Sequence, residues 1–209
     1  MSDDIPKAYI DADIPNRFWP HEPFDDALPP SGWLTDFVLA TRGIETPTSI
    51  SFWSAVFILS SLLKRDVYLA RFPFNLYPNF YVIVVAPPRV CAKTTAVKFG
   101  EKILSLALEN NFKDPVEKET KRLNILRKVT PQVISERMRP YDNTVYKDGH
   151  GYRIEHGSEA CFIVSELSTM LSREKFNDGL VSVLTNLYDC PDEDSVDTIS
   201  RGKIVLRDV

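Results

Sequence analysis

The sequence predicts an α/β fold in which helices flank a parallel β-sheet and a small helical subdomain precedes it. Residues 80–85 are β-branched or aromatic and carry no charge, which is typical of a central parallel strand covered on both faces. Residues 161–164 form a second short apolar run, and helical patterns occupy much of the chain between these two runs. A chain of 209 residues that is 44% hydrophobic can bury one sizeable core.

The sequence predicts three segments: an extended arm (residues 1–30), a helical subdomain (31–75) and the sheet-containing core (76–209). Repeated prolines indicate that the first segment is an arm, which docks through Phe18, Trp19 and Phe24, and not a domain. Apolar residues at i, i+3 and i+4 spacing predict two helices in the next segment, over residues 32–43 and 49–63.

The elements of the core follow from local patterns. A helix is expected to follow the first strand directly, and Pro115 and the pair Thr130-Pro131 are suited to the starts of two more. The acidic stretch 189–197 lacks the spacing and the glycine of a calcium-binding EF-hand loop, and it predicts a solvated loop. The expected elements are helices at 93–110, 115–128, 132–139 and 178–188, a projecting hairpin at 142–157, and a strand at 204–209.

The chemistry that the sequence indicates lies where the first strand meets the next helix. Lys93, Thr94 and Thr95 follow the apolar run and open the helix, which is the context of a phosphate-binding loop. Helix N-terminal amides face the phosphates there, a lysine neutralises the β- and γ-phosphates, and a hydroxyl binds Mg²⁺. Pro87 and Ala92 stand at the two positions where that loop pattern has glycine. The alternative is an ordinary strand-to-helix turn with an exposed lysine.

The second apolar strand ends in Ser165-Glu166. In P-loop ATPases of the RecA and AAA+ type, the corresponding strand ends in Asp-Glu, where the aspartate holds the metal through water and the glutamate polarises the attacking water. Ser165 brings a hydroxyl without charge, so a lower Mg²⁺ affinity is expected. Glu166 is the candidate base, and its alternative is a solvent-facing residue at a strand end.

Three blocks of the chain, spanning roughly residues 30–209, resemble a family of phage, prophage and plasmid P-loop proteins associated with replication helicases and primases. The first block is Thr46-Pro47-Thr48-Ser49, Phe52-Trp53 and Leu76-Tyr77-Pro78-Asn79. The second is Arg89-Val90-Cys91-Ala92-Lys93-Thr94-Thr95. The third comprises Ser165-Glu166-Leu167-Ser168, Gly179-Leu180, Leu187-Tyr188-Asp189-Cys190-Pro191 and Arg201-Gly202-Lys203 with the strand after it.

The resemblance implies a nucleotide-binding ATPase or helicase-like module of phage or mobile-element DNA replication, with ATP and Mg²⁺ as cofactors. It implies catalytic roles for Lys93 and Glu166. It also implies that Thr94, or Thr95 in this irregular loop, ligates Mg²⁺ and that Ser165 contacts Mg²⁺ through water. The implied nucleotide-binding residues are Arg89, Val90, Cys91, Ala92, Lys93, Thr94 and Thr95. It also makes Arg201 and Lys203 candidates for reaching a neighbouring subunit's nucleotide, against an ordinary surface role.

The chain departs from this family at the nucleotide site. Relatives usually keep a glycine where Ala86 or Arg89 stands, and an aspartate where Ser165 stands. Two accounts therefore stay open. In one the chain is a working ATPase with an atypical loop, and in the other it is a non-catalytic P-loop-fold interaction protein, an adaptor or inhibitor of a replication ATPase.

The end of the chain predicts an incomplete core. Residues 204–206 would form the next strand of a five-stranded sheet, and its unpaired edge calls for another copy of the chain or a second protein. The contacts are expected on the last helix and strand and on the arm, at Leu180, Val183, Leu184, Ile204, Leu206 and Trp19. Bases outnumber acids over 98–139, so single-stranded DNA is a further candidate partner within an assembly, although the net charge of −4 does not indicate an autonomous nucleic-acid binder.

Composition limits the remaining classes. No apolar run approaches the roughly 20 residues that a membrane helix needs, and the N-terminus is acidic, so a cytoplasmic protein of a bacterial host cell is expected, with no membrane contact. The three cysteines form no C-x-x-C pair and are expected to be free thiols. The three histidines are scattered, which argues against a zinc site.

Overall fold

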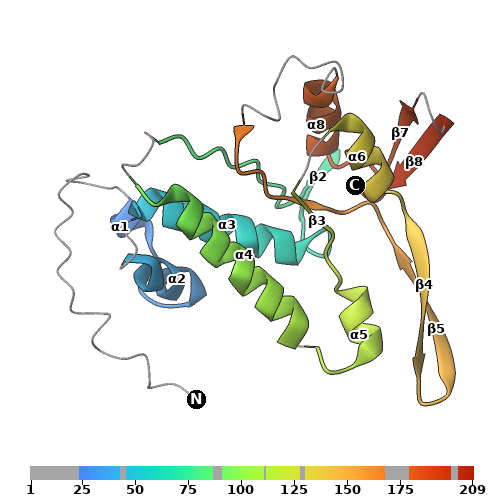
Figure 1. Ribbon diagram of the computed structural model, residues 1–209, viewed down its shortest axis with the longest axis horizontal. Helices are drawn as coiled ribbons and strands as arrows, with labels where there is room; N and C mark the ends of the chain where they lie inside the picture. Colours follow the sequence, from blue (N-terminus) through green and yellow to red (C-terminus); the bar gives the residue numbers. More distant parts are fainter. Residues whose placement is uncertain are drawn as a thin grey trace. The chain divides into compact units, whose positions relative to one another are not determined.

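The computed structural model describes residues 24–42, 46–86, 91–110, 112–127, 130–167, 179–198 and 202–209. The protein is a mixed α/β protein with small sheets (Figure 1). Its described residues divide into two compact units: one comprises those up to Ser60 together with Phe80–Ser105, and the other comprises Ser61–Asn79 together with Leu106–Val209. The three predicted segments, 1–30, 31–75 and 76–209, remain predictions.

The first unit is helical. Its elements are α1 (Phe24–Ala27), α2 (Trp33–Thr41), most of α3 (Thr48–Leu63) and most of α4 (Lys93–Asn110). The helices expected at 32–43, 49–63 and 93–110 are therefore confirmed, and α1 is a short helix within the predicted arm. The buried apolar side chains of this unit belong to α2, α3 and α4: Phe37, Val38, Ala55, Ile58, Ala96 and Leu104.

A glycine allows close packing between these helices. A β-carbon at Gly100 of α4 would lie 2.6 Å from Cδ1 of Ile58 on α3 and 3.7 Å from the Phe37 ring on α2. The ring of Phe99, the residue before it, lies 5.5 Å from that of Phe37 between centroids. Glycine costs about 1 kcal/mol relative to alanine inside a helix, so its place in α4 is explained by this close approach.

The prediction of a buried central strand at residues 80–85 is wrong. Residues 80–86 have no strand partner among the described residues, and alternate side chains of the segment are exposed. The side chain of Ile83 is 64% exposed and that of Val85 is 87% exposed. An apolar run states only that burial is favourable, whereas a strand also needs a neighbour for its backbone hydrogen bonds, and the run itself does not specify that neighbour.

The second unit contains the small sheets of the described structure. Its antiparallel hairpins are β1 (Leu69–Arg71) with β2 (Phe74–Leu76), β4 (Tyr141–Lys147) with β5 (His150–His156), and β7 (Glu193–Thr198) with β8 (Gly202–Arg207). Its helices are α5 (Pro115–Thr120), α6 (Pro131–Arg137) and α8 (Leu180–Tyr188). The starts expected for α5 and α6 are confirmed, with Pro115 and Pro131 in their first turns.

The only parallel pair among the described strands joins β3 (Ile125–Leu126) to β6 (Cys161–Phe162). The apolar strand predicted at 161–164 is present in this shorter form, but β3 lies where the sequence predicted the second half of the 115–128 helix. α5 ends at Thr120 because the chain then turns to place Leu126 in the core. The predicted parallel sheet flanked by helices is thus represented by one short pair in the described structure.

The prediction of an unpaired strand at the end of the chain is wrong. β8 pairs antiparallel with β7 over the whole of both strands, and β7 occupies the stretch predicted as a solvated acidic loop. Ile204 and Leu206 are buried, as is Leu180 of α8, so these three residues are not available as the exposed contact surface that the sequence predicted. They pack instead within their own unit.

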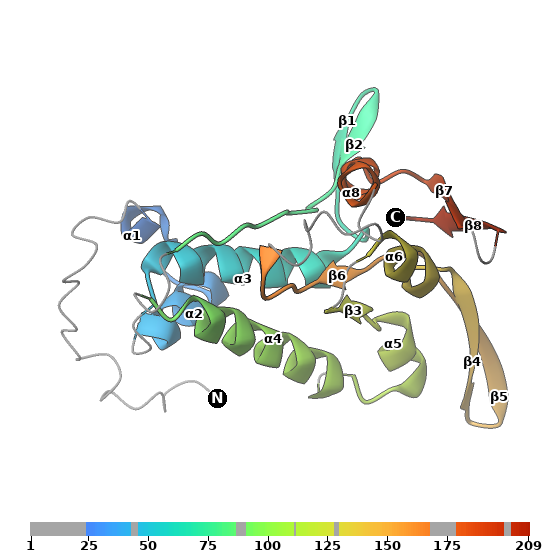
Figure 2. The ribbon, with the colours of Figure 1, turned by 45° about the horizontal axis from the view of Figure 1, so that its top comes forward.

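The core of the second unit lies between α6, α8, β3 and the end of the chain. Figures 1 and 2 both show α6 and α8 close together. The buried residues are Leu126, Ile134, Met138, Leu180, Leu187, Ile204, Leu206 and Val209, with Val183 and Leu184 packed against them.

The hairpin predicted at 142–157 is confirmed as β4 and β5, which extend away from α6 as a two-stranded ribbon (Figure 2). Asp148 and Gly149 form its two-residue turn with φ values of 51° and 79°. A two-residue turn with φ > 0 at both positions matches the twist of antiparallel strands, and the sequence Asp-Gly is well suited to it. Within the described ranges, no helix is both long enough and apolar enough to span a membrane.

Candidate functional site

The first candidate site is the N-terminus of α4, which begins at Lys93 as predicted. The carbonyl of Ala92 accepts hydrogen bonds from the backbone amides of Thr95 and Ala96, at 3.0 and 3.2 Å. The first turn contains no acidic residue, so the positive end of this 18-residue helix has no neutralising side chain of its own there. Thr94 and Thr95 are exposed at that end.

The Lys93 side chain extends back toward the segment that precedes the helix. Its Nζ donates a 3.2 Å hydrogen bond to the carbonyl of Ala86, the last described residue of the extended segment. On the other side, the hydroxyl of Thr46 donates to the carbonyl of Ala92 at 3.4 Å. Lys93 therefore places its charge between Ala86 and the N-terminus of α4.

The other predicted loop residues are only partly described. Cys91 is a half-buried free thiol, and Ala92 is also half-buried. Arg89 and Val90 lie outside the described residues, as do Pro87 and Arg201. Lys203 is exposed on β8.

Ser165 and Glu166 follow the parallel strand β6 and are both exposed. They belong to the second compact unit, whereas Lys93, Thr94 and Thr95 belong to the first. The structure thus places the lysine and the two threonines together on one helix end, and Glu166 belongs to the other unit. Among the described residues, no group of three His, Cys, Asp or Glu side chains is arranged to hold a metal ion. Thr94 and Ser165 would contribute hydroxyl groups, which are not ligands of that type, and their Mg²⁺ contacts remain a prediction.

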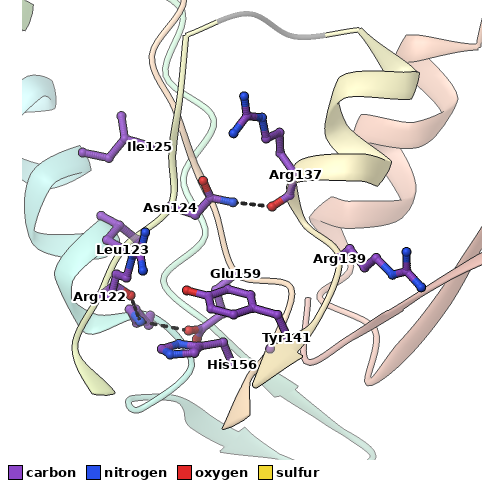
Figure 3. Close-up of a pocket in the computed structure, with 11 residues that line it drawn as sticks. Arg122, Leu123, Asn124, Ile125, Arg137, Arg139, Tyr141, His156 and Glu159 are labelled. Carbon is purple, nitrogen blue, oxygen red and sulfur yellow. Dashed lines mark hydrogen bonds and ion pairs between the residues drawn. The ribbon is translucent and has the colours of Figure 1, made fainter. Parts of the chain in front are cut away.

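A second candidate site, which sequence reasoning missed, is a pocket of about 380 Å³ in the second unit (Figure 3). We call it the basic pocket because four cationic side chains and one carboxylate line it. The lining residues are Lys64, Arg122, Leu123, Asn124, Ile125, Arg137, Arg139, Tyr141, His156, Gly157 and Glu159.

The acidic groups at this pocket are already paired. Glu159 lies 3.3 Å from Nζ of Lys64 and also accepts the backbone amide of Arg65 at 2.9 Å. Glu119, which does not line the pocket, contacts the lining residue Arg122 at 3.3 Å. A hydrogen bond from Asn143, and after it a hydrogen bond from Arg122, lower the pKa of Glu119 although partial burial opposes them. Glu159 and Glu119 therefore neutralise Lys64 and Arg122 in part.

An aromatic stack forms one wall of the basic pocket. The rings of Tyr141 and His156 lie 4.5 Å apart between centroids with an interplanar angle of 16°, and the Arg122 guanidinium lies 6.0 Å from the Tyr141 ring. His156 Nε2 lies 3.2 Å from Oε1 of Glu119, although the two groups do not meet hydrogen-bond geometry. Burial lowers the pKa of His156 and raises that of Tyr141. Both rings are therefore uncharged at neutral pH.

Comparison of the chain with protein-family models, with curated proteins and with solved structures gives no match. The chain's own residues and the motif resemblance are therefore the basis for assigning a function.

Proposed function

We propose that the chain binds ATP with Mg²⁺ at the N-terminus of α4 and acts as an ATPase or helicase-like module in phage or mobile-element DNA replication. The observation that carries the nucleotide-binding part is the position of Lys93. It opens an 18-residue helix without an acidic first turn, and its ammonium group donates a hydrogen bond to the carbonyl of Ala86. An anion at this end of α4 would meet a helix N-terminus, a lysine and two exposed hydroxyls.

In this proposal each residue has a separate task. Lys93 exchanges the Ala86 carbonyl for phosphate oxygens and neutralises charge at the β- and γ-phosphates. Thr94, or Thr95 in this irregular loop, provides the hydroxyl ligand of Mg²⁺. Glu166 orients the attacking water, and Ser165 hydrogen-bonds a metal-bound water without adding charge. The replication setting comes from the motif resemblance alone.

The finer fold assignment, a P-loop-like parallel core, is part of the same proposal. Its support is the parallel pairing of β3 with β6, because Glu166 follows β6 after a short extended segment, as the catalytic glutamate does in such cores.

Calorimetric titration with Mg-ATP tests the nucleotide-binding part. A charge-assisted phosphate contact contributes about 1.5–3 kcal/mol, so Lys93→Ala should weaken binding at least tenfold. Lys98→Ala is the matched control, since Lys98 is exposed on the same helix and the change in net charge is identical. Equal affinities in the wild type and Lys93→Ala would exclude this site.

The second candidate function is the interaction protein, and a specific surface favours it. The β1–β2 hairpin and the residues before it expose a run of large apolar side chains, with Phe72 at its tip essentially fully exposed. The exposed side chains are Val67, Tyr68, Leu69, Phe72, Phe74 and Leu76. Contiguous apolar surface of this kind marks docking sites. A homo-oligomer or a replication ATPase is the partner that this alternative expects.

Measuring ATP turnover distinguishes the two proposed functions. If the wild type binds Mg-ATP but releases no phosphate, even with single-stranded DNA present, the adaptor or inhibitor account replaces the ATPase account. The hairpin variant Phe72→Ser/Phe74→Ser should then abolish association in light scattering while nucleotide binding stays unchanged.

A further inference from the structure

Two arginines at the basic pocket carry charge that nothing in the described structure neutralises. Arg137 ends α6, and Arg139 lies two residues later, before β4. Both side chains are exposed, and neither has an ion-pair partner among the described residues. Figure 3 shows their guanidinium groups extending in different directions from the end of α6. A cation in the last turn of a helix is favourable for that helix, which accounts for Arg137 in part but not for Arg139.

The rest of the pocket leaves this excess charge in place. Glu159 is satisfied by Lys64 and by the amide of Arg65, and Lys64 also donates to the carbonyl of Arg122 at 2.7 Å. The Asn124 side chain donates to the carbonyl of Arg137 at 2.5 Å, which fixes the end of α6 beside the pocket. These contacts fix the shape of the pocket. Its lining carries a net positive charge, although the whole chain has a net charge of −4.

The aromatic wall adds a surface for a planar group. Tyr141 is 43% exposed and is supported on His156, which holds its ring in place. A base stacked on an aromatic ring contributes binding that tolerates any sequence, and arginines beside it contact the phosphates. The lining matches one nucleotide unit of a flexible strand better than a free anion, because it combines a ring face with separated cations.

We propose that the basic pocket binds single-stranded nucleic acid, with a base on Tyr141 and neighbouring backbone phosphates on Arg137 and Arg139. A free phosphate ion and a nucleic-acid strand share the phosphate group. A nucleic-acid strand differs because it also provides a base and a second phosphate. This site is separate from the proposed nucleotide site at Lys93 and does not depend on it.

Fluorescence anisotropy with a labelled oligothymidylate of about 12 nucleotides tests the proposal. Arg137→Gln/Arg139→Gln should weaken binding about tenfold or more and should reduce the slope of log affinity against log salt by about 0.7 per lost contact. Lys113→Gln/Lys118→Gln is the control, because it removes the same charge from exposed positions of the same unit outside the pocket, and it should change affinity by less than about twofold. Equal losses in both double variants would reduce the effect to net charge and overturn the proposal.

Further variants assign the base contact. Tyr141→Leu should lose affinity, whereas Tyr141→Phe should retain it, since the stack needs the ring and not the hydroxyl. Lys93→Ala should bind the oligonucleotide as the wild type does, which keeps the two sites distinguishable. If inorganic phosphate displaces the oligonucleotide at equal phosphate concentration, the site takes small anions and the proposal fails.

A measurement on the wild type guards against variants that do not fold. Ultraviolet cross-linking to an oligonucleotide carrying bromodeoxyuridine, followed by peptide mapping, should mark the peptide that contains Tyr141. Cross-links confined to peptides outside residues 122–159 would overturn the assignment.

Discussion

The guanidinium of Arg65 lies 4.4 Å from the centroid of the Tyr77 ring, and its Nη2 donates a 3.0 Å hydrogen bond to the Tyr77 hydroxyl. Its Nη1 donates to the main-chain oxygens of Cys190, Pro191 and Val209. One side chain thus joins the segment after α3 to the β2 end and to both segments that flank the β7–β8 hairpin. The Arg65 side chain is 15% exposed, so little water competes for these bonds.

Arg65→Lys should destabilise the protein by about 2 kcal/mol or more, because an ammonium lacks the planar fork that serves several acceptors at once. Chemical denaturation measures the free energy of unfolding. Arg71→Lys is the control, since Arg71 is exposed on β1 and should change that free energy by less than about 0.5 kcal/mol. If Arg65→Lys leaves the free energy of unfolding unchanged, the hydrogen-bond network adds no stability.

Gly100→Ala should destabilise the first unit by about 1 kcal/mol, although alanine favours a helix. The new methyl group would meet Cδ1 of Ile58, and the cost of overpacking exceeds the gain in helix propensity. Ile58→Val removes that carbon. It should cost about 0.5–1.5 kcal/mol in the wild type but stabilise the Gly100→Ala variant. Additive changes in the free energy of unfolding would contradict the close packing of α3 on α4.

Lowering the pH should reduce the stability of the second unit in two steps. Burial lowers the pKa of His156, so the folded state binds its proton less readily than the unfolded state, and stability falls as pH drops below the ordinary value of about 6.5. Glu119 has a lowered pKa, so its contribution is present above about pH 4.5 and is lost at lower pH.

His156→Phe keeps a ring against Tyr141 and removes the titrating group. It should reduce the loss of stability between about pH 7.5 and 5.5, a loss that is at most about 1.4 kcal/mol per pH unit for one proton. Lys64, Arg122 and Glu119 also act on this histidine, so urea unfolding is compared at constant ionic strength. An unchanged pH profile in His156→Phe would show that another group is responsible.

Glu166→Gln should retain Mg-ATP binding and abolish phosphate release, because the amide keeps the shape of the side chain and loses the base. Glu159→Gln is not a suitable control, since Glu159 is held by Lys64, so Glu155→Gln on the exposed face of β5 is used. Turnover that persists in Glu166→Gln would assign the base to another residue.

Local signals in the sequence predicted local structure well. Asp114 and Thr130 cap α5 and α6 by accepting the amides of Val116 and Val133, and a proline follows each cap, so both helix starts could be read directly. The Asp-Gly turn of the β4–β5 hairpin is equally local.

Features that depend on distant pairing were not predictable in the same way. The strand expected at 80–85 and the antiparallel partner of β8 are both questions of which segments meet, and an apolar or acidic run does not answer them. The basic pocket was missed because its residues come from separate segments around 64, 122, 137 and 156, each of which resembles an ordinary charged surface. The basic excess over 98–139 was the one available signal, and it includes three of the four cations.

The central claim is that nucleotide phosphates bind at the N-terminus of α4. Amide chemical shifts measured during titration with a non-hydrolysable Mg-ATP analogue test it most directly. The account predicts saturable shifts concentrated at residues 91–96, which Lys93→Ala abolishes and Lys98→Ala preserves. Saturable shifts confined to the basic pocket, or the absence of any at residues 91–96 in the wild type, would contradict the claim.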